Sequence, residues 1–309
     1  MTNTTDTPTA ATPATTADPT QLLPNGIALG PAHLTVRDLE RSLPWYTDAL
    51  GLVLVARTDE TATLGSVDGP VVIELTQDPA ATPAGRTAGL YHVALNMSRI
   101  ELSRMVRRIV QAKAAIQGAS DHGTHEAIYL PDPDGNGFEL AADRPRSQWP
   151  DWNDNPGSIQ PQPLDLESLF AVSGDAPIPP HAERVFTGHL HLTVGDIEQG
   201  LTHYRDTVGF GVKFMMPTAA FVSADGYHHH LGFNTWNGVG VGPAPEHTAG
   251  LRTWTLELPT SADVDALEAR LAAAGSPTSR DSNGGLFAPD PWGITMRVIA
   301  PGDSSPSHD

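Results

Sequence analysis

Segments in which apolar and polar residues alternate follow one another along the chain, with helical segments between them. LYHVALNM at 90–97 alternates with a period of two, which is typical of a half-buried strand. The next segment, SRIELSRMVRRIVQAKAAI at 98–116, has its apolar residues at helical spacing. Alternating strands follow and end in GFEL at 137–140. This order predicts a unit of one strand, one helix and three further strands, βαβββ.

The same order recurs because the chain contains an internal repeat. HLTVRDLERSLPWYTDALG, which begins at His33, matches HLTVGDIEQGLTHYRDTVG, which begins 158 positions later at His191. TAGLYHVALNM from Thr87 matches TAGLRTWTLEL from Thr248, and DPDGNGFEL matches DPWGITMRV further along. In the first copy, Asp38 is the expected N-cap of a helix. Three matches in one order indicate a duplicated module, each copy containing two βαβββ units.

The duplication divides the chain into two modules and three connecting or terminal segments. The sequence therefore predicts an α+β fold of four βαβββ half-modules, with modules at 28–143 and 185–300. The segment 144–184 is rich in Pro, Asp, Asn and Ser and is expected to be a linker with one short helix at most. The ends, 1–27 and 301–309, have the composition of disordered tails.

Composition excludes several kinds of partner and ligand. The chain has 18 basic and 36 acidic residues, a formal charge of −18, so nucleic acid and anionic membranes are not expected as partners. It has no cysteine, so a metal site must use imidazole, carboxylate or water. No apolar run approaches the ~18 residues of a membrane-spanning helix. The N-terminus lacks the pattern of a signal peptide, and we expect a cytoplasmic protein.

Three consecutive histidines interrupt an apolar segment, GYHHHLGFNTW, at 226–236. We expect the whole segment to be a strand, in which side chains alternate between two faces. His228 and His230 would then face a polar cavity, whereas His229 would share the core face with Leu231 and have a structural role.

These motifs together resemble the vicinal oxygen chelate superfamily. Its members include glyoxalase I, bleomycin-resistance proteins and extradiol ring-cleaving dioxygenases of type I. The resemblance extends over residues 28–300. Within the superfamily, the chain is similar above all to the two-module bacterial catechol 2,3-dioxygenase subgroup. It is carried by HLTVRDLERSLPWYTDALGL, LYHVALNM, LPDPDGNGFELAADRPRSQW, GHLHLTVGDIEQGLTHYRDTVGF and GYHHHLGFNTW. The resemblance implies that the sheets form open, barrel-like halves around a metal cavity.

The repeat identifies equivalent positions on the cavity face of the strands. In the superfamily these positions hold a metal through two His and one Glu in the dioxygenases, and through four ligands in glyoxalase I. The equivalent positions are His33, Glu74, His92 and Glu139 in the first module, and His191, His230, Thr253 and Arg297 in the second. Thr253 and Arg297 cannot bind a cation, so only the half-module with His92 and Glu139 can complete a site.

Two ways of completing the site remain open. His33 and Glu74 could complete it within the first module, or His191 and His230 could complete it across the modules. We favour the crossed site because His191 and His230 would otherwise be buried without partners, which is costly. The expected metal ligands are therefore His191, His92 and Glu139, with His33, Glu74 and His230 as alternative ligands.

Two imidazoles and one carboxylate form the facial triad of non-haem Fe(II) oxygenases. The resemblance then implies an Fe(2+)-dependent extradiol dioxygenase, with Mn(2+) or another divalent metal as alternatives. Its partners would be O2 and a catechol-type aromatic diol, and its product a muconic semialdehyde. The resemblance assigns His230 as the acid–base group, His122 as a hydrogen-bond partner of the diol and Tyr129 as a substrate-holding group. His125 receives no role.

Two other functions fit part of the sequence. A glyoxalase I-type isomerase would use the quartet His33, Glu74, His92 and Glu139, but would leave the three histidines at 228–230 unexplained. A non-catalytic binder of the bleomycin-resistance type would fit the acidic composition, but would have no use for the His and Glu positions. Proteins of this fold commonly pair their modules edge to edge, so a homo-oligomer is compatible with the sequence.

Overall fold

The computed structural model describes residues 22–150 and 160–301, so the predicted disordered tails lie mostly outside the described residues. Within them the predicted α+β fold of four βαβββ half-modules is confirmed. The first contains β1 (Ala28–Val36), α1 (Leu39–Pro44), η2 (Trp45–Ala49), β2 (Val53–Arg57), β3 (Thr61–Gly65) and β4 (Val71–Gln77). The second contains β5 (Gly89–Asn96), α2 (Arg99–Ala112), β6 (Gly118–Asp121), β7 (His125–Pro131) and β8 (Gly137–Asp143).

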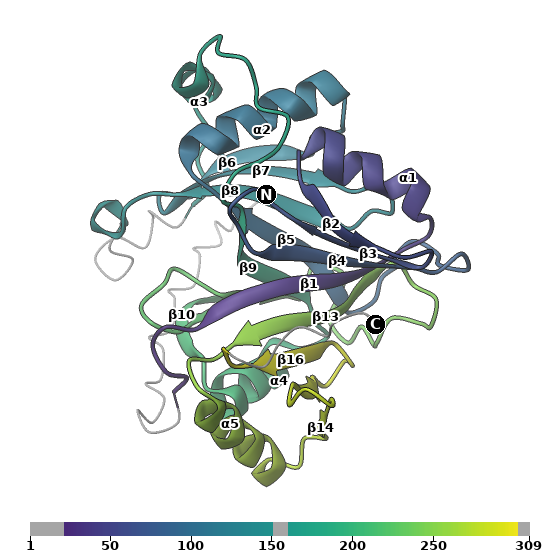
Figure 1. Ribbon diagram of the computed structural model, residues 1–309. Coiled ribbons are helices and arrows are strands. Elements are labelled where there is room, and N and C mark those ends of the chain that lie inside the picture. Colours follow the sequence, from purple (N-terminus) through teal and green to yellow (C-terminus); the bar gives the residue numbers. More distant parts are fainter. Residues whose placement is uncertain (1–21, 151–159, 302–309) are drawn as a thin grey trace, which may run out of the picture.

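The second module repeats this order. Its first half contains β9 (Phe186–Thr193), α4 (Ile197–Leu201), η5 (Thr202–Val208), β10 (Gly211–Met216), β11 (Ala219–Ser223) and β12 (Leu231–Asn234). Its second half contains β13 (Gly250–Glu257), α5 (Ser261–Ala273), β14 (Ser279–Arg280), β15 (Leu286–Pro289) and β16 (Thr295–Ile299). Figure 1 shows the sheet between two groups of helices, with α1 and α2 at one end and α4 and α5 at the other.

The helices begin where their capping residues predict. The Asp38 carboxylate accepts hydrogen bonds from the backbone N–H groups of Glu40 and Arg41. Pro44 then lies inside the helix and lacks an N–H group, and the chain continues from Trp45 as a turn of wider, π-type hydrogen bonding. The helix predicted over 98–116 begins after its cap Ser98 and ends at Ala112, because the next residue adopts a left-handed conformation.

The half-modules pair across the repeat. The sheet order is β14-β15-β16-β13-β1-β9-β5-β8-β7-β6. β1 of the first module pairs with β13 of the second, and β5 of the first module pairs with β9 of the second, both antiparallel. Each barrel-like half of the sheet is therefore built from both modules, and the prediction of crossed half-modules is confirmed.

The segment between the modules packs against the first module. One helix, α3 (Leu166–Ser173), lies in it, together with a short 3₁₀ turn, η3 (Arg146–Gln148). The Arg108 guanidinium on α2 donates to the backbone carbonyls of Pro179 and His181 and forms a buried ion pair with Glu101 at 2.9 Å. Among the described residues, no helix is long and apolar enough to cross a membrane.

The strand predicted over 226–236 is shorter than expected. β12 begins only at Leu231, and the three histidines lie in the turn that leads into it. Asp225 and Gly226 both adopt positive φ, 52° and 66°, so the chain reverses direction just before the histidines. The alternation that assigned their faces therefore does not apply.

Candidate metal centre

Glu139 lies at the centre of a buried cluster of imidazoles. Its side chain is 2% exposed, and its Oε2 atom lies 3.1 Å from His92 Nε2 and 3.3 Å from His189 Nε2. Its Oε1 atom accepts a hydrogen bond of 2.8 Å from His125 Nε2. The ligand atoms of His92, Glu139 and His189 all lie within 4.8 Å of one another, which is the spacing of a metal-binding group.

Three neighbouring strands bring this cluster together. β5 pairs with β8 in parallel and with β9 in antiparallel orientation, so it lies between them. Ala94 of β5 is opposite Glu139 on one side and opposite His189 on the other. The small methyl side chain at this position leaves room for both larger side chains. His92 lies two residues earlier on β5 and shares the face of Ala94.

His189 replaces His191 in the three-residue group that the structure brings together. The two histidines are two residues apart on β9, so they share a face. His191 lies next to the cluster, with its ring centroid 5.1 Å from that of His92, and its Nε2 atom is buried without a hydrogen-bond partner in the described chain.

Sequence comparison missed His189 because its repeat equivalent is Pro31, which cannot bind a metal. The alignment of the two modules therefore directed attention to His191 and its equivalent, His33. A usable signal was the pattern His-Leu-His, in which both imidazoles point to one side of a strand.

The alternative ligands His33 and Glu74 lie in the other barrel. β9 lies between β1 and β5 in the sheet, so His33 is opposite Thr253 rather than near His92. The His33 ring hydrogen-bonds to Thr76 Oγ1 at 2.7 Å. The quartet within the first module is therefore not formed.

The three consecutive histidines have different surroundings from those expected. His230 Nδ1 accepts a hydrogen bond from the backbone N–H of Ala224 and contacts Ser223 Oγ at 3.0 Å, so this ring is directed away from the cluster. His229, which was expected to face the core, lines the cavity beside His189, with 4.1 Å between ring centroids. Its Nδ1 atom lies 2.9 Å from His228 Nδ1.

His228 links the second module to the end of β8. Its Nε2 atom lies 3.2 Å from Asp143 Oδ1, and the Tyr227 hydroxyl donates to the other oxygen of Asp143 at 2.7 Å. The His228 ring stacks on His125, with ring centroids 4.8 Å apart. Because His125 in turn bonds to Glu139, hydrogen bonds and one pair of stacked rings join Asp143 to the cluster.

His122 and Tyr129 both line the cavity beside the cluster. The Tyr129 hydroxyl and His122 Nε2 are hydrogen-bonded at 2.7 Å, and Tyr129 is opposite Glu139 in the pairing of β7 with β8. The His122 ring stacks on that of His125, with 4.7 Å between centroids. The structure therefore brings both residues to the cavity, and their roles stay predictions.

Burial and mutual contact set the charges of the cluster. Burial lowers the pKa of His189 to about 4, although the neighbouring carboxylate of Glu139 opposes this. Burial alone would raise the pKa of Glu139, but hydrogen bonds and charge interactions with His189, His125 and His92 hold it well below its usual range. Near pH 7 the cluster therefore combines an ionised carboxylate with a neutral His189.

The donor set fits a divalent metal. A metal requires neutral imidazoles and an ionised carboxylate. His92 Nε2 is buried and lies 3.1 Å from Glu139 Oε2, but it makes no hydrogen bond of suitable geometry among the described residues. An unpartnered buried nitrogen is costly, and a cation would satisfy it. Two imidazoles and one carboxylate suit iron, manganese or zinc.

The cluster opens into a cavity of about 380 Å³. One wall carries the histidines with Tyr129 and Glu139, and the other carries apolar side chains from β10, β11 and the segment after β12. The aromatic rings are in contact, with 5.5 Å between the centroids of Phe221 and His191 and 5.3 Å between those of Trp236 and His191. A cavity of this size suits a small organic ligand next to a metal.

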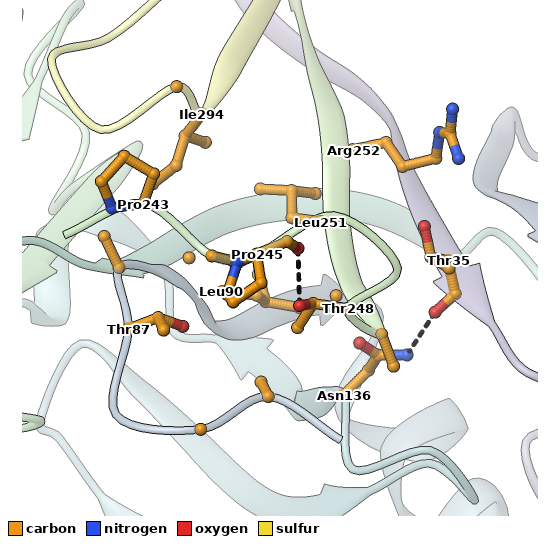
Figure 2. A pocket seen from close by; sticks show the side chains of 18 of the residues that line it. Thr35, Thr87, Leu90, Asn136, Pro243, Pro245, Thr248, Leu251, Arg252 and Ile294 are labelled. Atoms are coloured by element: carbon orange, nitrogen blue, oxygen red, sulfur yellow. Dashed lines mark hydrogen bonds between the residues drawn. The ribbon is translucent and has the colours of Figure 1, made fainter. Parts of the chain in front are cut away.

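A second pocket, of about 510 Å³, lies elsewhere. Figure 2 shows that it is lined by the beginnings of β5 and β13, with Leu90 and Leu251 labelled, and by the loop of Pro243 and Pro245. Arg252 extends at its edge. No group of three metal-binding side chains lies in it within the described chain. The smaller cavity is therefore the one that contains the candidate metal centre.

Comparison with known proteins places the fold and the repeat in a family. Residues 28–140 and 187–298 both match the family model of the Glyoxalase/Bleomycin resistance protein/Dioxygenase superfamily. A protein of Bacillus subtilis (strain 168) named catechol-2,3-dioxygenase is 37% identical over 252 residues, which are 80% of this chain and 88% of that protein.

Solved structures agree on the fold. A Bacillus subtilis protein provisionally described as a dioxygenase superposes with a TM-score of 0.63 at 12% identity, covering 89% of this chain and 86% of the other. Glyoxalase I from Zea mays superposes with a TM-score of 0.56 at 19% identity, covering 90% and 94%.

Proposed function

The chain belongs to the Glyoxalase/Bleomycin resistance protein/Dioxygenase superfamily, and from this premise we propose that it is a metal-dependent extradiol dioxygenase. It uses O2 to open the ring of a catechol-type aromatic diol beside a hydroxyl-bearing carbon, and the product is a muconic semialdehyde. Fe(2+) is the proposed metal. The relative named catechol-2,3-dioxygenase, which matches most of both chains, supports this activity.

The observation that carries the proposal is the group formed by His92, Glu139 and His189. Of the four overlapping groups of three His, Asp or Glu side chains in the described residues, it is the one in which all three side chains are buried. Three protein ligands on one side leave up to three coordination positions open toward the cavity, which suffices for both diol oxygens and O2. A glyoxalase I-type site would need a fourth protein ligand, and the two candidates from the first module, His33 and Glu74, lie in the other barrel.

The metal, when bound, supplies the position where diol and O2 meet and the path for electrons between them. The surrounding residues bind the diol and move its protons. Burial lowers the pKa of His122 to about 4 and the pKa of His229 well below its usual value, so both rings are neutral near pH 7 and can accept a proton from a diol hydroxyl. The Tyr129 hydroxyl, already bonded to His122, is available to hold the substrate oxygen.

Within this proposal His229 takes the acid–base role that the sequence suggested for His230. His229 lines the cavity, whereas His230 bonds to Ser223 and Ala224. We expect His229→Gln to lower kcat by ~10²–10⁴-fold, the usual effect of losing a general acid–base group. His230→Gln is the matched control and should lose much less. The opposite ranking returns the role to His230.

The direct test is anaerobic purification, loading with Fe(2+) and addition of catechol and air. We expect consumption of O2 with formation of a yellow ring-opened product, and loss of both in His92→Ala and Glu139→Ala. Turnover of a methylglyoxal–thiol adduct without cleavage of any diol would instead support an isomerase. Tight binding of small cations without metal or turnover would support a bleomycin-resistance-type binder.

A further inference from the structure

The walls of the cavity beside the metal centre carry one charged side chain, Glu139. Imidazoles, hydroxyl groups and apolar side chains make up the rest of the described lining, with no lysine or arginine among them. The three stretches outside the described residues, 1–21, 151–159 and 302–309, contain neither lysine nor arginine in their sequences. No lysine or arginine therefore lines this cavity.

The arginines that follow β8 are engaged elsewhere. Arg144 forms a two-pronged ion pair with Asp121, with distances of 2.7 and 2.9 Å. Arg146 donates to the backbone carbonyl of Asp225 at 2.9 Å. These contacts hold both guanidinium groups outside the cavity lining.

Part of the cavity wall is formed by apolar side chains of the second module. Phe214 and Met216 come from β10, Phe221 from β11, and Trp236 follows β12. The Phe214 and Phe221 rings are stacked with centroids 6.0 Å apart, and Trp236 meets Tyr91 edge-on at 5.0 Å. A ring substituent that points away from the diol oxygens meets this wall.

We propose that the substrate is a catechol with an uncharged, apolar ring substituent and that catechols with a carboxylate substituent are excluded. This inference rests on the proposed function. A carboxylate against the Phe214–Phe221 wall would lose its hydration without gaining a cationic partner, which is costly. The net charge of −18 adds repulsion. A methyl, alkyl or aryl group would instead bury apolar area there.

The most informative ligand pair is methyl 3,4-dihydroxybenzoate and 3,4-dihydroxybenzoate, which differ in charge but little in shape. We expect kcat/KM for the ester to exceed that for the acid by at least about 100-fold, which corresponds to the loss of a few kcal/mol. Anaerobic titration calorimetry on the metal-loaded protein should give a similar ratio of dissociation constants. Ratios below about threefold in both measurements would overturn the proposal.

A variant with a cation in the wall tests the cause. Met216→Arg should improve binding and turnover of the acid relative to the ester by about tenfold or more, because the carboxylate gains a partner. Met216→Leu, which conserves volume, should keep the wild-type ratio. A folded Met216→Arg variant that cleaves the ester but gains nothing for the acid contradicts the proposal.

A control for overall charge is Val55→Arg on β2, where the side chain is 58% exposed in the other barrel. It should leave the ratio unchanged, and an equal gain in this variant would show that net charge, not the wall, excludes the acid. The two hypotheses fail differently. Cleavage of neither these two compounds nor catechol itself would refute the dioxygenase function, whereas equal cleavage of both would refute only the substrate class.

Discussion

Ala94 determines how closely the metal-binding side chains approach one another. It is fully buried and lies opposite His189 on one strand and Glu139 on the other. A larger side chain here would push the two neighbours apart, because buried interiors have no spare volume. The spacing of the cluster thus depends on a residue that binds nothing itself.

The first prediction separates the two histidines of β9. His189→Ala should reduce bound metal, measured by elemental analysis after dialysis, to less than about a tenth of the wild-type content, because one of three protein ligands is lost. His191→Ala should retain most of the metal, because its ring lies beside the three-residue group and not in it. Loss of metal in the His191 variant alone would restore the ligand set expected from the sequence.

The second prediction concerns Asp290, whose pKa burial raises to about 6. One of its oxygens accepts from the Tyr204 hydroxyl, and the other accepts from two backbone N–H groups. The folded state holds this proton more tightly than the unfolded chain, whose pKa is near 3.8. The stabilisation is therefore complete below pH 3.8 and is lost as pH rises through 6.

We expect this loss to amount to about 3 kcal/mol, since each pH unit between the two pKa values contributes ~1.4 kcal/mol. Asp290→Asn should remove it. The measurement is the free energy of unfolding in urea between pH 4 and 7 for both proteins. Parallel pH profiles for wild type and variant would show that Asp290 titrates normally.

At the scale of secondary structure, the linker is held to the first module by hydrogen bonds from a buried arginine, which also forms an ion pair within its own helix. Arg108 is 5% exposed, pairs with Glu101 on the same helix and donates to two carbonyls of the linker. Arg108→Leu should lower the free energy of unfolding by ~3 kcal/mol, because it leaves a buried carboxylate without its main partner.

The matched control for this third prediction is Arg57→Leu. Arg57 pairs with Glu40 at the surface, where the Glu40 side chain is 77% exposed. Exposed pairs contribute at most ~1 kcal/mol, so this variant should unfold near the wild-type urea concentration. Equal losses in both variants would show that the buried pair has no special contribution.

Sequence periodicity predicted the elements well but not their exact ends. The strands and helices of the four half-modules follow from alternation, helical spacing and capping residues such as Asp38 and Ser98. The turn that contains the three histidines could not be predicted, because it depends on positive φ at Asp225, a conformation that aspartate only sometimes adopts. One unpredicted turn was enough to exchange the surroundings of His229 and His230.

The candidate site was predicted in part, for a related reason. His92, Glu139, His122 and Tyr129 were found from motifs within one module, and the structure brings them to one cavity. The partner from the other module depends on the register between β5 and β9, which contains two irregularities. Register between distant strands is set by the whole sheet and is not visible in either strand alone.

At the scale of the whole molecule, the crossing of half-modules forms two barrels, and only one of them carries the candidate metal-binding residues of the described chain. The second and third half-modules build the barrel with the metal centre, and the first and fourth build the other. In that second barrel the position of Glu139 is taken by Arg297, which forms an ion pair with Asp281. Among the described residues, the candidate metal-binding groups therefore lie in only one of the two barrels.

This arrangement has a consequence for the history of the gene. Neither copy of the duplicated segment can be deleted, because each contributes one half of the working barrel. Substitutions at the cavity positions of the outer halves, such as Thr253 and Arg297, would in contrast leave the candidate metal centre intact as long as the strands still pack.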